Sequence, residues 1–147
     1  KYRGALKKPA TPELLAITRD ALNFEATVAA YRTHFDQYAV NLALETLLQH
    51  ATACNQFIDT QKPWTVAKHP ELADRLDAIL YQLAESLRLI AILLSPIMPK
   101  AARGIFDQLG ISGDFTLEQA RWGELPDGHR VGTPVPLFPQ IEKPDTD

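Results

Sequence analysis

A single tryptophan in a polar, proline-marked connection is the residue of this chain best suited to recognition chemistry. Trp64 follows Lys62-Pro63, and Lys68 lies shortly after it. Proline cannot continue a helix and biases the residue before it towards an extended backbone, so we expect a helix to end before Pro63 and Trp64 to lie on a surface connection. An indole beside lysines suits stacking of an unpaired nucleobase.

The same tryptophan has a structural interpretation that remains open from the sequence. Most tryptophans in small helical domains are packing residues, and a buried indole N–H bonds a carbonyl oxygen. In that case Trp64 is a hydrophobic plug that closes one end of a helical bundle.

The other residues able to do chemistry do not form a catalytic or metal-binding pattern. The histidines show no metal-ligand spacing, so we expect no metal site and a surface position for each of them: His34, His50, His69 and His129. Glu85 is interpreted as a solvated carboxylate on a helix face, and Arg88 as a long side chain whose charged end reaches water. Phosphate-binding glycine loops and nucleophile motifs are absent from the sequence, so no catalytic residue is assigned.

Composition restricts the class of protein. The 147 residues suffice for one domain with a core of its own, and the single cysteine, Cys54, falls on an apolar repeat that predicts a buried thiol. No apolar run approaches the roughly 18 residues that span a bilayer, and no secretory segment is present, so we expect a cytoplasmic chain without membrane contact. A net charge of −3 argues against strong, autonomous binding to nucleic-acid backbone.

Apolar residues at alternating steps of three and four predict an all-α, antiparallel helical bundle. The expected helices are one long helix from Pro12 to Phe35, a second capped by Asp36 and ending before Pro63, a third from Pro70 to Leu94, and a shorter one from Pro99 to Leu109. The third carries the most large apolar side chains, so we expect it at the centre. Gly110 is placed for a left-handed C-terminal cap.

Beyond Gly110, glycines and prolines are dense and predict an irregular C-terminal tail. We expect a one-turn helix near residues 117–120, extended pieces at 130–131 and 135–138, and a frayed end at 143–147. The expected anchors of the tail are Trp122, Leu137 and Phe138. The predicted organisation is a linker over residues 1–10, a helical bundle over 11–110, and a tail over 111–147 packed on the bundle.

Several segments together resemble the anticodon-binding domain of methionyl-tRNA synthetase. The first is Asn55-Gln-Phe-Ile-Asp-Thr-Gln-Lys-Pro-Trp64, followed by Lys68. Later matches keep that family's order and spacing, and are residues 80–90, Leu94-Ser-Pro-Ile-Met-Pro99, Ile105-Phe-Asp-Gln-Leu-Gly110 and Pro136-Leu-Phe-Pro-Gln-Ile-Glu142. The resemblance extends from Lys1 to Glu142.

The resemblance implies a binding role for particular residues. In this family the CAU anticodon of tRNA-Met is read partly by stacking on the tryptophan that matches Trp64, with Pro63 beside it. Asn55 also matches a family position, although an amide at a helix end bonded to nearby backbone explains it equally well. Lys62, Lys68 and Arg75 are candidates for contacts with the tRNA backbone, with solvated surface charge as the alternative. The family's other base readers, an asparagine and an arginine, lie on a helix that would precede Lys1.

The resemblance also implies which functions lie elsewhere. The family's catalytic signatures, His-Ile-Gly-His and Lys-Met-Ser-Lys-Ser, are absent from these 147 residues. ATP and methionine would therefore bind a separate catalytic domain, and we expect this chain to need no cofactor and to be inactive by itself. Its expected partners are the tRNA-Met anticodon stem-loop and that catalytic domain. The alternatives are the corresponding domain of another class I synthetase and a helical protein-interaction module.

Overall fold

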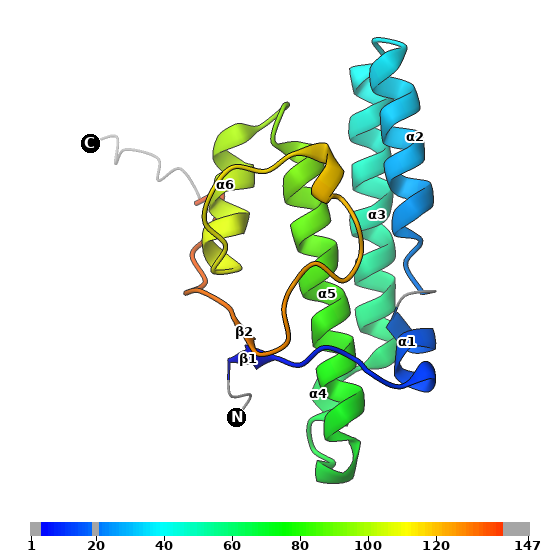
Figure 1. The fold of residues 1–147 in the computed structure, drawn as a ribbon, viewed down its shortest axis with the longest axis vertical. Helices are drawn as coiled ribbons and strands as arrows, with labels where there is room; N and C mark the ends of the chain where they lie inside the picture. Colours follow the sequence, from blue (N-terminus) through cyan, green and yellow to red (C-terminus); the bar gives the residue numbers. More distant parts are fainter. Residues whose placement is uncertain (1–3, 19–20, 140–147) are drawn as a thin grey trace, which may run out of the picture.

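The structure, a computed structural model, describes residues 4–18 and 21–139. Its elements are the strands β1 (Ala5–Leu6) and β2 (His129–Arg130), the helices α1 (Pro12–Thr18), α2 (Phe24–Asp36), α3 (Val40–Gln61), α4 (Pro63–Val66), α5 (Ala73–Leu94) and α6 (Pro99–Gln108), and two short 3-10 turns, Pro70–Leu72 and Leu117–Gln119. In Figure 1, α2 and α3 form an antiparallel pair beside α5, and α6 packs on the other side of α5. The predicted helical bundle with an irregular tail is confirmed.

The long helix expected from Pro12 to Phe35 is wrong, because the chain forms two helices there. Asn23 caps α2, and its side-chain oxygen accepts the Ala26 N–H at 3.0 Å. Leu22, which precedes this cap, is buried in the core. The apolar stripe continues across the break, so residue spacing alone did not reveal it. Residues 19 and 20 lie outside the described part.

The turn between α2 and α3 also differs from the prediction. Asp36 is the last residue of α2 and does not cap α3. The turn is closed by backbone instead, since the Ala39 N–H bonds the His34 carbonyl at 2.8 Å and Tyr38 adopts a left-handed conformation with φ 58°. Tyr38 is 93% exposed, and the turn between α2 and α3 that contains it lies at the end of the bundle opposite α4 (Figure 1).

Helix α5 is the central element, as its apolar pattern predicts. It contacts α1, α2, α3, α4 and α6. Ile79, Leu89 and Leu93 are fully buried on it. The Tyr31 hydroxyl donates to the Leu93 carbonyl at 2.7 Å, and burial raises the pKa of Tyr31 to about 12. Helix α6 ends at Gln108, and Gly110 follows it as the expected left-handed residue, with φ +70°. An added Cβ at Gly110 would lie 2.5 Å from the Arg130 carbonyl oxygen.

Two charged residues of α5 are buried, which corrects their assignment to the surface. Glu85 is 0% and Arg88 4% exposed, and the Arg88 guanidinium donates to both Glu85 carboxylate oxygens at 3.0 and 2.9 Å. Glu85 also accepts the backbone N–H groups of Gly123 and Leu125 at 2.7 and 2.9 Å. Arg88 donates to the carbonyls of Gln119, at 2.7 Å, and of Arg121.

The tail packs over this ion pair because each provides hydrogen-bond partners that the other needs. An irregular segment crossing a bundle leaves buried backbone donors and acceptors that need partners, and a buried charge needs several hydrogen bonds. The Glu85–Arg88 pair meets both needs at residues 119–125. These contacts fix the tail across the face of α5.

The remaining contacts of the tail agree with the prediction only in part. Trp122 is an anchor, since its indole N–H donates to Gln82 Oε1 at 2.6 Å, whereas Phe138 is 71% and Leu137 38% exposed. Leu125 is a further anchor that the prediction missed, since only 3% of its surface is exposed. The one-turn helix near residue 117 is present. Of the two extended pieces, Arg130 lies in β2 and residues 135–138 form no strand.

The linker expected at residues 1–10 carries a strand in its described part. β1 pairs antiparallel with β2, with Ala5 opposite Arg130 and Leu6 opposite His129. The Lys8 N–H and ammonium also bond the tail, at Asp127 Oδ1 (2.8 Å) and the Gly123 carbonyl (2.7 Å). Residues 143–147 lie outside the described part. Within residues 4–18 and 21–139, no helix is long and apolar enough to cross a membrane.

Candidate nucleic-acid interface

The candidate interface is the corner where α3 ends and α4 begins. Lys62 has φ 47° and ψ 61°, a left-handed conformation, and serves as both the C-cap of α3 and the N-cap of α4. Its N–H bonds the Ile58 carbonyl at 2.9 Å. Pro63 then opens α4, where its missing N–H and fixed φ are suited to a first helical position. The predicted helix end before Pro63 is confirmed.

Trp64 is exposed at this corner, so its interpretation as a hydrophobic plug is wrong. The residue is 54% exposed, whereas Val66 is 8% exposed and belongs to the core. Helix α4 lies against α5, and Val66 is the apolar residue that it buries there. The indole is therefore available for a ligand, and base stacking stays a prediction.

The structure brings Arg75 to the same corner. Arg75 lies in the first turn of α5, and its Nη2 donates to Gln61 Oε1 of α3 at 3.0 Å. Lys62 and Lys68 are exposed on either side of Trp64 in the chain. In the part of the chain that the structure describes, neither lysine side chain has a hydrogen-bond or ion-pair partner. The corner thus presents free positive charge beside an aromatic surface.

Asn55 is exposed on α3, but not at the end of that helix as expected. The helix continues to Gln61, which places Asn55 about 9 Å along the axis from the corner, at about 1.5 Å per residue. No hydrogen bond holds its side-chain amide among the described residues. The amide is therefore free to contact a ligand that extends from the corner along α3.

Two contributors to the corner were missed by the sequence reasoning. Gln61 accepts the hydrogen bond from Arg75, and Val66 provides the buried anchor of α4. The signal for Gln61 was its position directly before the helix-ending Lys62-Pro63. Val66 had no distinguishing signal, since Trp64 is an equally apolar neighbour in the same segment.

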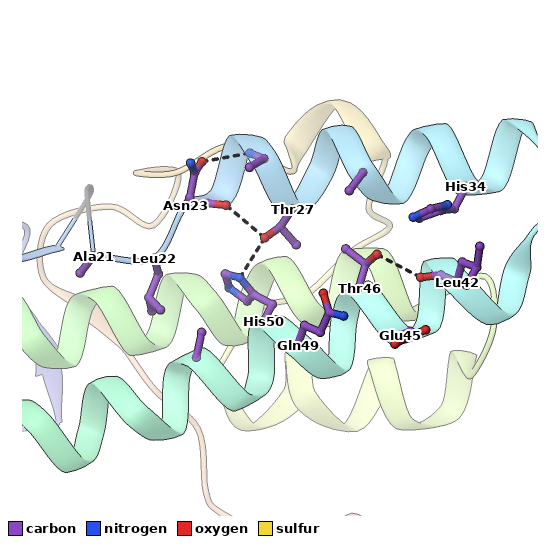
Figure 2. Close-up of a pocket in the computed structure, with 13 residues that line it drawn as sticks. Ala21, Leu22, Asn23, Thr27, His34, Leu42, Glu45, Thr46, Gln49 and His50 are labelled. Carbon is purple, nitrogen blue, oxygen red and sulfur yellow. Dashed lines mark hydrogen bonds between the residues drawn. The ribbon is translucent and has the colours of Figure 1, made fainter.

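A hollow of about 500 Å³ lies between α2 and α3, lined by residues between Ala21 and Ala53, and Figure 2 shows the side chains around it. His50 lines this hollow and is buried, with 5% of its surface exposed, which corrects its assignment to the surface. The Thr27 hydroxyl donates to the Asn23 carbonyl at 3.1 Å, so the His50 Nδ1 at 3.1 Å from that hydroxyl oxygen must be the N–H donor. Burial lowers the pKa of His50 below its ordinary value of 6.5. Burial therefore favours the neutral form of this histidine in the folded protein.

We expect His50 to make stability depend on pH. Its folded pKa is lowered, so the unfolded chain binds the proton more readily, and the stability from neutral His50 is complete above about pH 6.5 and is lost as pH falls below it towards the folded pKa. Urea unfolding at pH 7.5 and 5.5 measures the loss. His50→Leu should lose less stability over this interval than wild type. His69→Gln, an exposed control, should follow wild type, and equal losses in all three proteins would contradict the assignment.

The described residues hold no group of three or more histidine, cysteine, aspartate or glutamate side chains that suits a metal ion. Cys54 is buried, as its place on the apolar repeat predicts, and burial raises the pKa of its thiol. A protonated, enclosed thiol is a poor nucleophile. At the corner, the exposed ring of Trp64 and the exposed side chains of Lys62 and Lys68 suit binding of a ligand.

The fold and the corner define a helical bundle domain that presents an aromatic residue at one end. Comparison with known proteins gives its family. A family model described as "Anticodon binding domain of methionyl tRNA ligase" matches residues 15–147. The chain belongs to this family of anticodon-binding domains, which excludes the corresponding domain of another class I synthetase.

Individual relatives and solved structures agree. The chain is 36% identical over 143 residues to the methionine–tRNA ligase of Caldanaerobacter subterraneus, covering 96% of this chain and 22% of that protein. It is 38% identical over 122 residues to that of Bacillus subtilis, covering 80% and 18%. The crystal structure of free Mycobacterium tuberculosis methionyl-tRNA synthetase matches with a TM-score of 0.76 and 29% identity, over 96% of this chain and 29% of that one. The chain spans about a fifth of the length of these curated relatives.

Proposed function

We propose that this domain binds the anticodon stem-loop of tRNA-Met, so that the catalytic domain of the same ligase attaches methionine to the correct tRNA in an ATP-dependent reaction. The observation that carries the proposal is the exposed indole of Trp64 at a corner with two free lysines. The family membership supports it, because its relatives are methionine–tRNA ligases. ATP and methionine bind outside this domain, and the cytoplasm is the compartment in which it acts.

The roles of the corner residues follow from their chemistry. Trp64 stacks on an unpaired base of the CAU anticodon, with Pro63 fixing the backbone beside it. Lys62 and Lys68 meet phosphates of the loop and stem. Asn55 hydrogen-bonds a base or sugar further along α3. These contacts discriminate between anticodons. Because the net charge of this chain is −3, strong electrostatic binding of the tRNA backbone comes from other surfaces of the ligase.

Competition binding tests this function. We expect the chain to bind a stem-loop carrying CAU in preference to one carrying another triplet, with a dissociation constant no tighter than about micromolar at physiological salt. Fluorescence anisotropy of a labelled CAU stem-loop, displaced by unlabelled competitors, measures both quantities. Equal displacement by all triplets would argue against base reading. No binding to any stem-loop would instead favour a protein-interaction module that docks a partner through Trp64 and the tail.

A further inference from the structure

The backbone at the α3–α4 corner adopts a conformation that its own sequence disfavours. Lys62 lies in the left-handed region at φ 47°, which residues with a Cβ adopt at a cost. This single residue sets the direction of α4 relative to α3, and so decides where Trp64 points. A strained hinge keeps one conformation only when the surrounding structure holds it in place.

Three side-chain contacts hold the corner, in addition to the backbone hydrogen bonds that Lys62 makes. Pro63 restricts the backbone directly after Lys62, and Val66 packs into the core on α5. The third contact is the bond from Arg75 Nη2 to Gln61 Oε1, which ties the last residue of α3 to the first turn of α5. It closes residues 62–74 into a loop whose two ends are joined by side chains. This is the one of the three contacts that lies at the surface and can be removed without disturbing the core.

We propose that Gln61 and Arg75 are a positioning pair that holds the α3–α4 corner and thereby fixes the exposed indole of Trp64 for stacking. The inference rests on the proposed function and changes the role of Arg75, which was a candidate for contact with the tRNA backbone. In this role Arg75 acts on Trp64 through Gln61, and its contribution to tRNA binding does not require contact with a phosphate. Gln61 becomes a functional residue although it carries no charge and touches no ligand.

Binding measurements distinguish a pair from two independent contacts. Gln61→Ala and Arg75→Ala should each weaken binding of the CAU stem-loop by about two- to tenfold, the range that one net hydrogen bond converts to. The double variant should lose no more than the weaker-binding single variant, because both changes remove the same bond. Arg75→Lys, which keeps a donor, should recover part of the loss.

Direct binding of phosphate by Arg75 is the alternative that would contradict the positioning role of Gln61 and Arg75. If Arg75 binds phosphate directly, Gln61→Ala will bind like wild type, while Arg75→Ala will show a shallower dependence of affinity on salt. Additive losses in the double variant would also contradict the inference. Measuring the affinity of wild type, Gln61→Ala, Arg75→Ala and the double variant over a series of salt concentrations provides these comparisons.

A readout without RNA separates this inference from the proposed function. Incorporating 5-fluorotryptophan gives fluorine resonances for Trp64 and Trp122. Trp122 is the internal reference, because its indole N–H is fixed on Gln82 Oε1 at 2.6 Å. Gln61→Ala and Arg75→Ala should change the shift and narrow the line of Trp64 alone. An unchanged Trp64 resonance would overturn the positioning role. Normal RNA binding by Trp64→Ala would overturn the proposed function while leaving the fluorine result to decide on the pair.

Discussion

Glu85→Leu should lower the free energy of unfolding by about 3–5 kcal/mol. The substitution leaves the Arg88 guanidinium, 4% exposed, without its carboxylate, and leaves the buried Leu125 N–H without an acceptor. Each of these losses strands a polar group away from water. Urea unfolding followed by circular dichroism measures the change, and the fluorine resonance of 5-fluorotryptophan at Trp122 reports whether the tail stays on α5.

Two companion variants show whether the charge or the hydrogen bonds matter. Glu85→Gln keeps one acceptor oxygen for the tail and removes the negative charge, so its loss should be intermediate. Adding Arg88→Met to Glu85→Leu should restore part of the stability, because it removes the stranded charge. A double variant no more stable than Glu85→Leu alone would contradict the account of a coupled pair.

Trp64→Ala should weaken binding of the CAU stem-loop by about 1–3 kcal/mol, or roughly five- to a hundredfold, and change melting little. The reason is that the indole is already 54% exposed and its loss opens no core cavity. Anisotropy titration and a thermal melt on the same protein measure the two effects.

Tyr38→Ala is the matched control for this prediction. Tyr38 is also an exposed aromatic residue, at 93%, and it belongs to the α2–α3 turn, which lies at the end of the bundle opposite α4 (Figure 1). Its loss should leave RNA affinity unchanged. In the full-length ligase, methionine activation without tRNA should survive Trp64→Ala. A Trp64→Ala protein that melts far lower yet binds RNA normally would reverse the functional assignment.

The sequence predicted best those features whose cause is local. Proline prevents a helix from continuing and suits its first turn, so Pro63 and Pro99 marked helix boundaries correctly. Gly110 likewise marked a left-handed cap. The break before Asn23 was missed because the apolar stripe remains continuous through it, and a lone asparagine is a weak helix-start signal.

Features that depend on distant residues were not predictable in this way. Glu85 and His50 look like ordinary polar positions on helix faces, and they are buried only because residues 119–125 and α2 cover them. The exposure of Trp64 has the same origin. Whether Trp64 or Val66 faces the core depends on the rotation of α4, and that rotation is set by the backbone of Lys62 together with contacts on α5.

The tail across α5 also has a consequence for synthesis on the ribosome. A nascent chain that has reached Leu109 contains every helix of the bundle, yet Glu85 and Arg88 still lack the backbone partners that come from residues 119–125. The strand at Ala5 must wait longer still, since its partner is Arg130. Because such distant contacts form late, the first and last described segments pair only near the end of translation of this region. Until then, the ion pair on the central helix α5 is exposed to water.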